Sequence, residues 1–260
     1  MNKQERIAAK LSRSHSRPRG QLPKMVDVGC VLHGKGYDWT YVERLYNMIT
    51  RHLPVPITFH VWTEHDRSVP AHMVKHCLQE WPGISGPKKS WWYKMQMFDP
   101  QHHDGDLLYF DLDTVIVSDL SWIVQETTDK FWILQDFRYL QNPRLTHNVN
   151  SSVMWWNVPT WQSVWNEFSN RNLNEVVRCY HGDQDLINAL IPPHRRQFLD
   201  THRVCSWRWQ ANDGGWDFKT RRPRSPGMGC VIDKSVSVLV FHGKPKPHQV
   251  TDTFVVTNWR

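Results

Sequence analysis

The sequence lacks the long apolar segments and the cysteine pairs that are typical of membrane and disulfide-rich proteins. None of its 260 residues belongs to an apolar run near the ~18 residues that a membrane-spanning helix needs. Residues 1–24 are basic and polar, without the apolar stretch of a secretory signal. The cysteines are odd in number and share no CxxC spacing: Cys30, Cys77, Cys179, Cys205 and Cys230. This pattern fits reduced thiols in a cytoplasmic protein better than a disulfide framework or a cysteine zinc site.

Positive charge is concentrated in two segments of the chain. The net charge is +7, yet residues 1–24 hold seven Lys or Arg against one Glu, and residues 195–224 hold eight against three Asp. The first segment is also poor in large apolar residues, which predicts a disordered arm over residues 1–24 ahead of a single domain over residues 25–260. Basic segments favour polyanionic partners such as DNA or a charged glycan. A solvated tail and a charged loop are an equally good explanation.

Apolar periodicity predicts a β-α-β unit at the start of the domain. Residues 26–32 and 57–62 are typical of buried strands, and apolar residues between Trp39 and Leu53 recur at helical spacing. Further strands are expected at 131–134, 148–158 and 236–241, and helices at 90–98, 161–168 and 181–188. This pattern predicts an α/β fold with a Rossmann-type mixed sheet flanked by helices, whose ligands bind at the carboxyl ends of strands.

Residues 106–119 place Asp111 and Asp113 within a strongly apolar strand. Two ionised carboxylates in such a strand lose hydration and repel each other, so a cation or a proton must neutralise them. Alternate strand residues point to the same side, so both carboxylates can bind one divalent metal ion if the strand ends or bends there. The alternative is a strand end with two solvated aspartates, which the apolar residues on both sides disfavour.

Polar residues at other strand ends and helix starts are further candidates for ligand binding. They are Lys94, Asn150, Asp183, Gln184, His242 and Lys244. Three of them also have a purely structural explanation: Lys94 as a surface lysine, Asp183 as a helix cap, and His242 as a structural histidine.

In chain order, these motifs resemble those of GT-A-fold glycosyltransferases, and most of all glycosyltransferase family 8. The similarity covers residues 25–248 and includes Lys94, Tyr-Phe-Asp-Leu-Asp, Asn-Ser-Ser-Val-Met-Trp-Trp-Asn, Asp-Gln-Asp-Leu-Ile-Asn and Phe-His-Gly-Lys-Pro. The resemblance implies one GT-A-like domain and a metal-dependent enzyme. It also implies a nucleotide-sugar donor, usually a UDP-sugar, transfer with retention, and a Mn²⁺ or Mg²⁺ ion that bridges the diphosphate.

The resemblance also implies a role for each candidate residue. The metal ligands would be Asp111, Asp113 and His242. The residues near the anomeric carbon, and hence the catalytic ones, would be Asp183 and Gln184. The donor-binding residues would be Leu32, Tyr37, Lys94, Asp111, Asn150 and Lys244. The motif around Lys244 is shorter than the family pattern, and residues 205–224 match no part of it.

Two other functions compete with glycosyl transfer. The segment Asp-Leu-Asp-Thr-Val also fits the first motif of haloacid-dehalogenase-type phosphohydrolases, in which the first Asp is a nucleophile and the second an acid/base. Those enzymes place this strand near the start of the core, whereas here a β-α-β unit precedes it. The two basic segments and fifteen tryptophans also suit a non-catalytic module that binds nucleic acid or glycan. Such a module has no need of three metal ligands.

Overall fold

The structure is a computed structural model that describes residues 17–84, 89–140, 142–212, 214, 216–217, 222–223 and 230–260. Residues 1–16 of the predicted arm lie outside the described residues. From Arg17 onward the chain contacts the body of the protein. Arg17 donates a hydrogen bond to the backbone oxygen of Val124 at 2.6 Å, and Arg19 forms an ion pair with Glu126 at 2.5 Å. The end of the predicted arm therefore packs beside α3 (Ser121–Val124).

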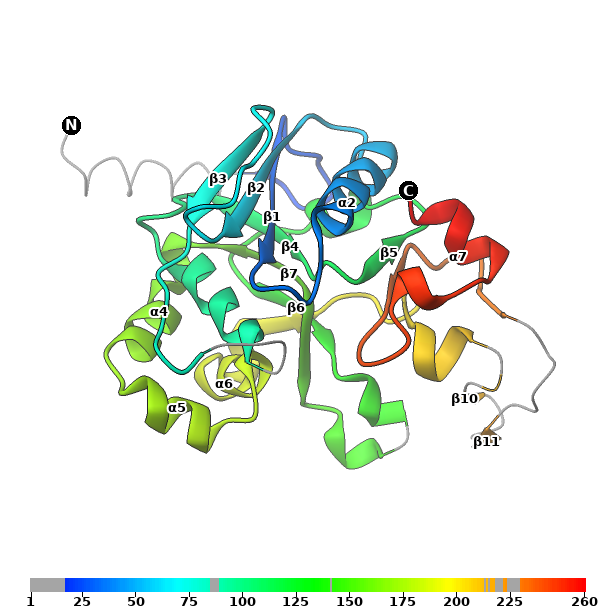
Figure 1. The fold of residues 1–260 in the computed structure, drawn as a ribbon. Coiled ribbons are helices and arrows are strands. Elements are labelled where there is room, and N and C mark those ends of the chain that lie inside the picture. The colour runs from blue at the N-terminus through cyan, green and yellow to red at the C-terminus, as the bar shows by residue number, and fades with distance from the viewer. Residues whose placement is uncertain are drawn as a thin grey trace.

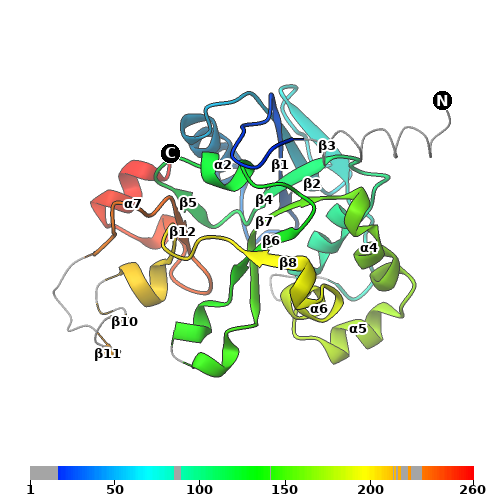
Figure 2. The same cartoon turned by 180° about the vertical axis from the view of Figure 1, so that it is seen from behind.

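A seven-stranded mixed sheet forms the centre of the protein (Figure 1, Figure 2). Its order is β3-β2-β1-β4-β7-β6-β8. The strands are β1 (Val26–Leu32), β2 (Ile57–Thr63), β3 (Met73–Cys77), β4 (Asp106–Phe110), β6 (Phe131–Gln135), β7 (Val149–Asn157) and β8 (Arg196–Phe198). All are parallel except β7, which is antiparallel to β4 and β6. Therefore β7 begins at the edge of the sheet where β1, β4 and β6 end.

The predicted strand at residues 106–119 is divided between two sheets. β4 ends at Phe110, and a turn in which the N–H of Thr114 donates to the backbone oxygen of Asp111 at 3.2 Å follows it. The chain then enters a second sheet of order β5-β12-β9, formed by β5 (Thr114–Ile116), β12 (Val238–Val240) and β9 (Val204–Ser206). A separate antiparallel pair consists of β10 (Trp216–Asp217) and β11 (Arg222–Pro223). Asp111 and Asp113 thus lie where the strand ends, which is the condition for sharing one ion.

Helices cover both faces of the central sheet (Figure 1). The α-helices besides α3 are α2 (Trp39–His52), α4 (Gln162–Ser169), α5 (Leu173–Cys179), α6 (Asp183–Leu190) and α7 (Thr253–Asn258). Short 3₁₀ helices are η1 (Ser90–Phe98), η2 (Phe137–Leu140), η3 (Pro143–Leu145), η4 (Pro159–Trp161), η5 (Pro193–Arg195) and η7 (Pro247–Gln249), and η6 (Trp207–Ala211) is a π-helix. The predicted mixed sheet flanked by helices is confirmed. Within the described residues, no helix has the length and apolar character needed to cross a membrane.

Alternate side chains of β4 belong to two different hydrophobic cores. Leu108 and Phe110 pack in the core that contains α2, whereas Leu107 and Tyr109 pack in the core that contains η1, α4 and α6. Asp111 continues the alternation of residues 107 and 109, so its side chain emerges on the side of η1. The alternation along β4 thus places the side chain of Asp111 on the side of the sheet where η1 packs.

Candidate active site

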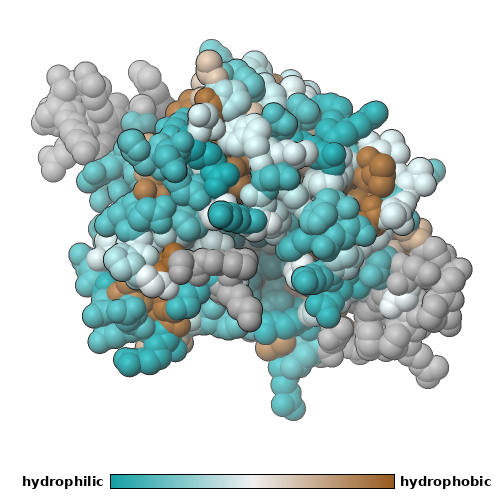
Figure 3. All heavy atoms as spheres, viewed as in Figure 1, coloured by the Kyte–Doolittle hydropathy of each residue, from teal (hydrophilic) through white to brown (hydrophobic). Residues whose placement is uncertain are grey.

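The carboxyl edge of the central sheet brings together most of the predicted polar residues. Asp111 follows β4, Tyr37 lies in the connection after β1, and the reversed strand β7 begins at the same edge. The N–H of Asp111 donates to the backbone oxygen of Ser152 at 2.8 Å, and the hydroxyl of Ser151 donates to Oδ2 of Asp183 at 2.6 Å. Figure 3 shows the surface hollowed near the centre of the view.

Lys94 joins the aspartate after β4 to the aspartate at the start of α6. Its Nζ lies 2.9 Å from Oδ1 of Asp111 and 3.0 Å from Oδ2 of Asp183, and it donates to Oγ of Ser151 at 3.0 Å. The hydroxyl of Tyr109 donates to the same Oδ1 of Asp111 at 2.5 Å. Lys94 is only 5% exposed. The alternative of a surface lysine is therefore wrong.

The electrostatics of this network keep Lys94 and Asp111 charged and keep the hydroxyl of Tyr109 protonated. Burial by itself lowers the pKa of Lys94, but the charges of Asp111 and Asp183 raise it above its ordinary value. Burial by itself raises the pKa of Asp111, but Lys94 and the hydroxyl of Tyr109 lower it below its ordinary value. Burial, with the charge of Asp111, raises the pKa of Tyr109. At neutral pH Lys94 is therefore an ammonium group, Asp111 a carboxylate and Tyr109 a protonated phenol.

Asp113 has a different set of partners. The hydroxyl of Tyr37 donates to Oδ2 of Asp113 at 2.8 Å, and the ammonium of Lys246 donates to the same oxygen. Nζ of Lys246 also lies 5.5 Å from the centre of the Tyr37 ring. Burial raises the pKa of Asp113 above its ordinary value; Lys246 opposes this rise, and the charge of Asp111 adds to it. Each aspartate of the pair thus has its own lysine partner.

Lys246 was missed by the sequence analysis, which selected Lys244 instead. Lys244 is exposed, whereas Lys246 reaches Asp113. Gly243, with φ of +76°, turns the chain directly after His242, and Lys246 is the residue that precedes η7. Lysines and prolines alternate over residues 244–247, so the sequence marks the segment but does not tell which lysine points inward.

His242 binds a serine of the second sheet. Its Nε2 lies 2.7 Å from Oγ of Ser206, and its ring stacks on Phe137 with centroids 5.3 Å apart and planes at 12°. Trp209 meets the same ring edge-on at 5.1 Å. Burial, together with the charge of Arg208, lowers the pKa of His242 to about 4. The imidazole is therefore neutral at neutral pH, which is the form that can bind a metal.

The predicted metal ligands fit a divalent ion in part. Asp111 and Asp113 offer the carboxylate oxygens that Mn²⁺ and Mg²⁺ prefer. Tyr37 and Lys246 both contact Oδ2 of Asp113, and among the described residues Oδ1 makes no hydrogen bond or ion pair. Within the described residues, the donor atoms of Asp111, Asp113 and His242 do not all lie within 4.8 Å of one another. Nε2 of His242 is occupied by Ser206, so Nδ1 is the nitrogen left to act as a third ligand.

The remaining predicted residues lie around the same edge with different exposure. Leu32 ends β1 and its side chain is fully buried, so only its backbone can contact a ligand. Asn150 is 9% exposed, and its Oδ1 accepts a hydrogen bond from the N–H of Ser152 at 3.0 Å. Gln184 is partly exposed and follows Asp183 in the first turn of α6.

No known sequence family and no curated protein matches this chain. Solved structures do match it. A crystal structure of an active-site mutant of LgtC has a TM-score of 0.58 at 12% identity, covering 88% of this chain and 91% of LgtC. The glycosyltransferase GlyE of Streptococcus pneumoniae TIGR4 has a TM-score of 0.57 at 14% identity, over 90% of this chain and 62% of GlyE.

The bifunctional glycosyltransferase WbbM also matches, with a TM-score of 0.57 at 14% identity over 92% of this chain. This chain spans 50% of WbbM. What the chain shares with these proteins is the mixed sheet with helices on both faces. The chain has the GT-A fold.

Proposed function

We propose that this chain is a metal-dependent glycosyltransferase of the family 8 type that moves a sugar, with retention, from a UDP-sugar to an acceptor hydroxyl. The observation that carries the proposal is the pair of ion networks at the carboxyl edge of the sheet, one at Asp111 and Asp183 and one at Asp113. The shared fold supports the class. One structure of LgtC is described as a galactosyltransferase in complex with donor and acceptor sugar analogues, and it matches with a TM-score of 0.58 at 13% identity.

The charges of the two networks suit a metal diphosphate. Among the described residues, the side chains of Asp111, Asp113 and Asp183 form ion pairs with the ammonium groups of Lys94 and Lys246. A divalent cation at this edge would add positive charge and make the site attractive to a diphosphate.

Further positive charge lies close by. Arg208 is exposed and lies close to Gly243. A Cβ atom placed on Gly243 would be 3.2 Å from Nη1 of Arg208. The guanidinium therefore lies over the segment that holds Lys246 and adds to the attraction for phosphate oxygens.

Different residues would bind different parts of the donor. Asp111 and Asp113 would hold a Mn²⁺ or Mg²⁺ ion, which when bound supplies neutralisation of the charge that develops on the leaving diphosphate. Lys246, once released from Asp113, would donate to a diphosphate oxygen. Lys94 fixes the carboxylate of Asp183, so that Asp183 can accept hydrogen bonds from hydroxyls of the donor sugar.

Three other residues complete the proposed donor site. Gln184 lies beside Asp183 on the first turn of α6 and would face the anomeric carbon. Asn150 would contact the sugar, and Tyr37 would stack on the base. Holding the donor in one orientation in this way lowers the entropic part of the barrier to transfer.

The acceptor that we propose is polyanionic, either a charged glycan or DNA. Arg196 does not serve it, because its guanidinium is buried and bonded to backbone oxygens of Ile191 and His147. Arg208 is exposed, and Trp209 lies next to the ring of His242. Arg221 and Arg224, which the sequence analysis included in the basic segment, lie outside the described residues.

A screen of UDP- and GDP-sugars with and without Mn²⁺ tests the proposal. Release of the free nucleotide measures donor turnover, and NMR of the product gives the anomeric configuration. We expect turnover that requires the metal and falls about 10²–10³-fold in Asp113→Asn, since one charge-stabilising group is lost. Glu43→Gln, an exposed substitution on α2, is the matched control.

Each competing function predicts a different result. Metal-independent transfer that Asp113→Asn leaves unchanged would contradict the proposal. Phosphate release from a simple ester, with no nucleotide-sugar turnover, would support the phosphohydrolase. Salt-sensitive DNA binding without any turnover, unaffected by Asp111→Asn, would support the binding module.

A further inference from the structure

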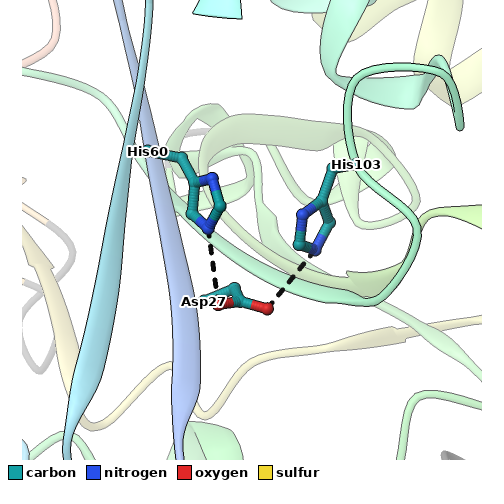
Figure 4. A group of neighbouring side chains, drawn as sticks. All are labelled: Asp27, His60 and His103. Carbon is teal, nitrogen blue, oxygen red and sulfur yellow. Dashed lines mark ion pairs between the residues drawn. The ribbon is translucent and has the colours of Figure 1, made fainter. Parts of the chain in front are cut away.

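Figure 4 shows a group of three side chains whose donor atoms could hold a metal ion. It lies at the end of the central sheet opposite to the candidate active site. It consists of Asp27 at the start of β1, His60 in β2 and His103 in the connection between η1 and β4. In the register of β1 and β4, Val28 pairs with Leu108, so Asp27 lies level with residue 107. Asp111 is four residues further along, about 13 Å at ~3.3 Å per residue. This group is therefore separate from the candidate active site.

The three side chains already have the spacing of a metal site. Nε2 of His60 lies 3.3 Å from Oδ1 of Asp27, and Nε2 of His103 lies 3.7 Å from Oδ2. All three donor atoms lie within 4.8 Å of one another. Zinc bonds to N and O ligands are about 2.0–2.2 Å long, so tetrahedral ligand atoms are about 3.3–3.5 Å apart. An ion thus fits between these atoms after small side-chain adjustments.

Nε2 of His60 is the atom of the group that most strongly indicates a bound cation. It is 7% exposed, and its Nε2 is buried without a hydrogen-bond partner among the described residues, although the carboxylate of Asp27 is close. Its Nδ1 lies 2.9 Å from Nε2 of His76, whose ring stacks on Trp62 with centroids 4.2 Å apart. If Nδ1 of His60 donates to His76, the lone pair of Nε2 points toward the carboxylate. Only a cation between them makes that arrangement favourable.

Without an ion, the same atoms have a second arrangement. His76 would donate to His60, and Nε2 of His60 would carry a proton toward Asp27. Nε2 of His103 lies 3.2 Å from the backbone oxygen of Asp106 and would donate there. The two arrangements differ in which nitrogens carry protons. Only the first leaves the lone pair of His60 Nε2 free to bind an ion, so a metal titration tests for it.

We propose that Asp27, His60 and His103 bind one Zn²⁺ ion, and that His76 orients His60 through their hydrogen bond. Imidazole nitrogens suit zinc better than Mg²⁺ or Mn²⁺, which prefer oxygen ligands. The side chain of Asp27 is 29% exposed, so water can take the fourth position. The ion would tie the connection before β4 to β1 and β2. This inference does not depend on the proposed glycosyl transfer.

The test uses the full chain, stripped with a chelator and then titrated with Zn²⁺. Metal content after dialysis should be one Zn²⁺ per chain, and Co²⁺ in its place should give the visible bands of a four-coordinate ion. At a free Zn²⁺ concentration of ~100 times Kd, Tm should rise by about 5–10 °C. A zinc content of zero, or an equal response to Mg²⁺, would overturn the proposal.

Variants locate the ion. Asp27→Asn and His103→Gln should abolish stoichiometric zinc binding, while His76→Gln should weaken it about 10–100-fold. His65→Gln, an exposed histidine outside the group, should bind zinc as the unchanged chain does. Far-UV circular dichroism of the metal-free variants checks that they fold. Zinc retained by Asp27→Asn and His103→Gln, or lost in His65→Gln, would refute the assignment.

Discussion

Replacing Lys94 with methionine is the sharpest test of the network that joins Asp111 to Asp183. Methionine has a similar length and shape but no charge, so the change removes the ammonium that lies 2.9 Å and 3.0 Å from the two carboxylates. Both carboxylates then remain in a site where the side chain of Asp183 is 7% exposed and that of Asp111 is 26% exposed. Removing one partner of a buried ion pair destabilises a protein by about 3–5 kcal/mol, because a buried charge is left uncompensated.

This loss is large against the total stability of a domain, which is about 5–15 kcal/mol. With an m-value near ~3 kcal/mol/M for urea, the midpoint of unfolding should fall by about 1–1.7 M. Because the substitution removes the cation that lowers the pKa of Asp111, that pKa should rise. A raised folded-state pKa favours the folded state as pH falls, so the deficit should be larger at pH 7 than at pH 5.

Urea unfolding followed by tryptophan fluorescence measures these differences. The double variant Lys94→Met with Asp183→Asn should recover part of the loss, since one uncompensated carboxylate is gone, with a coupling of about 0.5–3 kcal/mol. Lys35→Met, at an exposed lysine, is the matched control and should change stability by less than ~0.5 kcal/mol. If Lys94→Met unfolds at the same urea concentration as Lys35→Met, with the same m-value, the buried ion network is wrong.

Two further predictions concern the loop after β12 and the turn after β1. Lys246→Ala should weaken binding of UDP with Mn²⁺ about 10–100-fold by calorimetry, because a charge-assisted hydrogen bond is lost. Lys244→Ala should change this affinity less than ~3-fold. A loss equal to or larger than that of Lys246→Ala would indicate that Lys244 contacts the diphosphate. Glu64 accepts from the N–H of Gly34 at 2.5 Å; although burial acts to raise its pKa, Arg67 and this bond lower the pKa to about 2. Its stabilising contribution is complete above pH ~4.5 and is lost as pH falls toward 2. NMR titration of the Glu64 carboxyl checks this, and Arg67→Met should shift the midpoint toward 4.5; an unchanged midpoint would contradict the assignment.

The α/β elements could be predicted from the sequence because they depend on local periodicity. Residues 26–32 were expected as a strand and form β1, and residues 90–98 were expected as a helix and form η1. The need for cations beside Asp111 and Asp113 could also be predicted from local sequence, because two charged residues lie among apolar neighbours. The structure meets this demand with two lysines, of which Lys94 was a candidate and Lys246 was not.

Strand order and strand direction, in contrast, depend on contacts between residues far apart in the chain. Only the reversed direction of β7 places Ser151 next to Lys94, and only the turn after β12 decides that Lys246 faces Asp113. Asp27, His60 and His103 lie in segments that show no shared motif, and the pairing of β1 with β2 brings the first two together. Local sequence thus determined the elements and the charges that need partners. The tertiary structure decided which partners they have, because side chains separated by tens of residues meet only when the sheet is assembled.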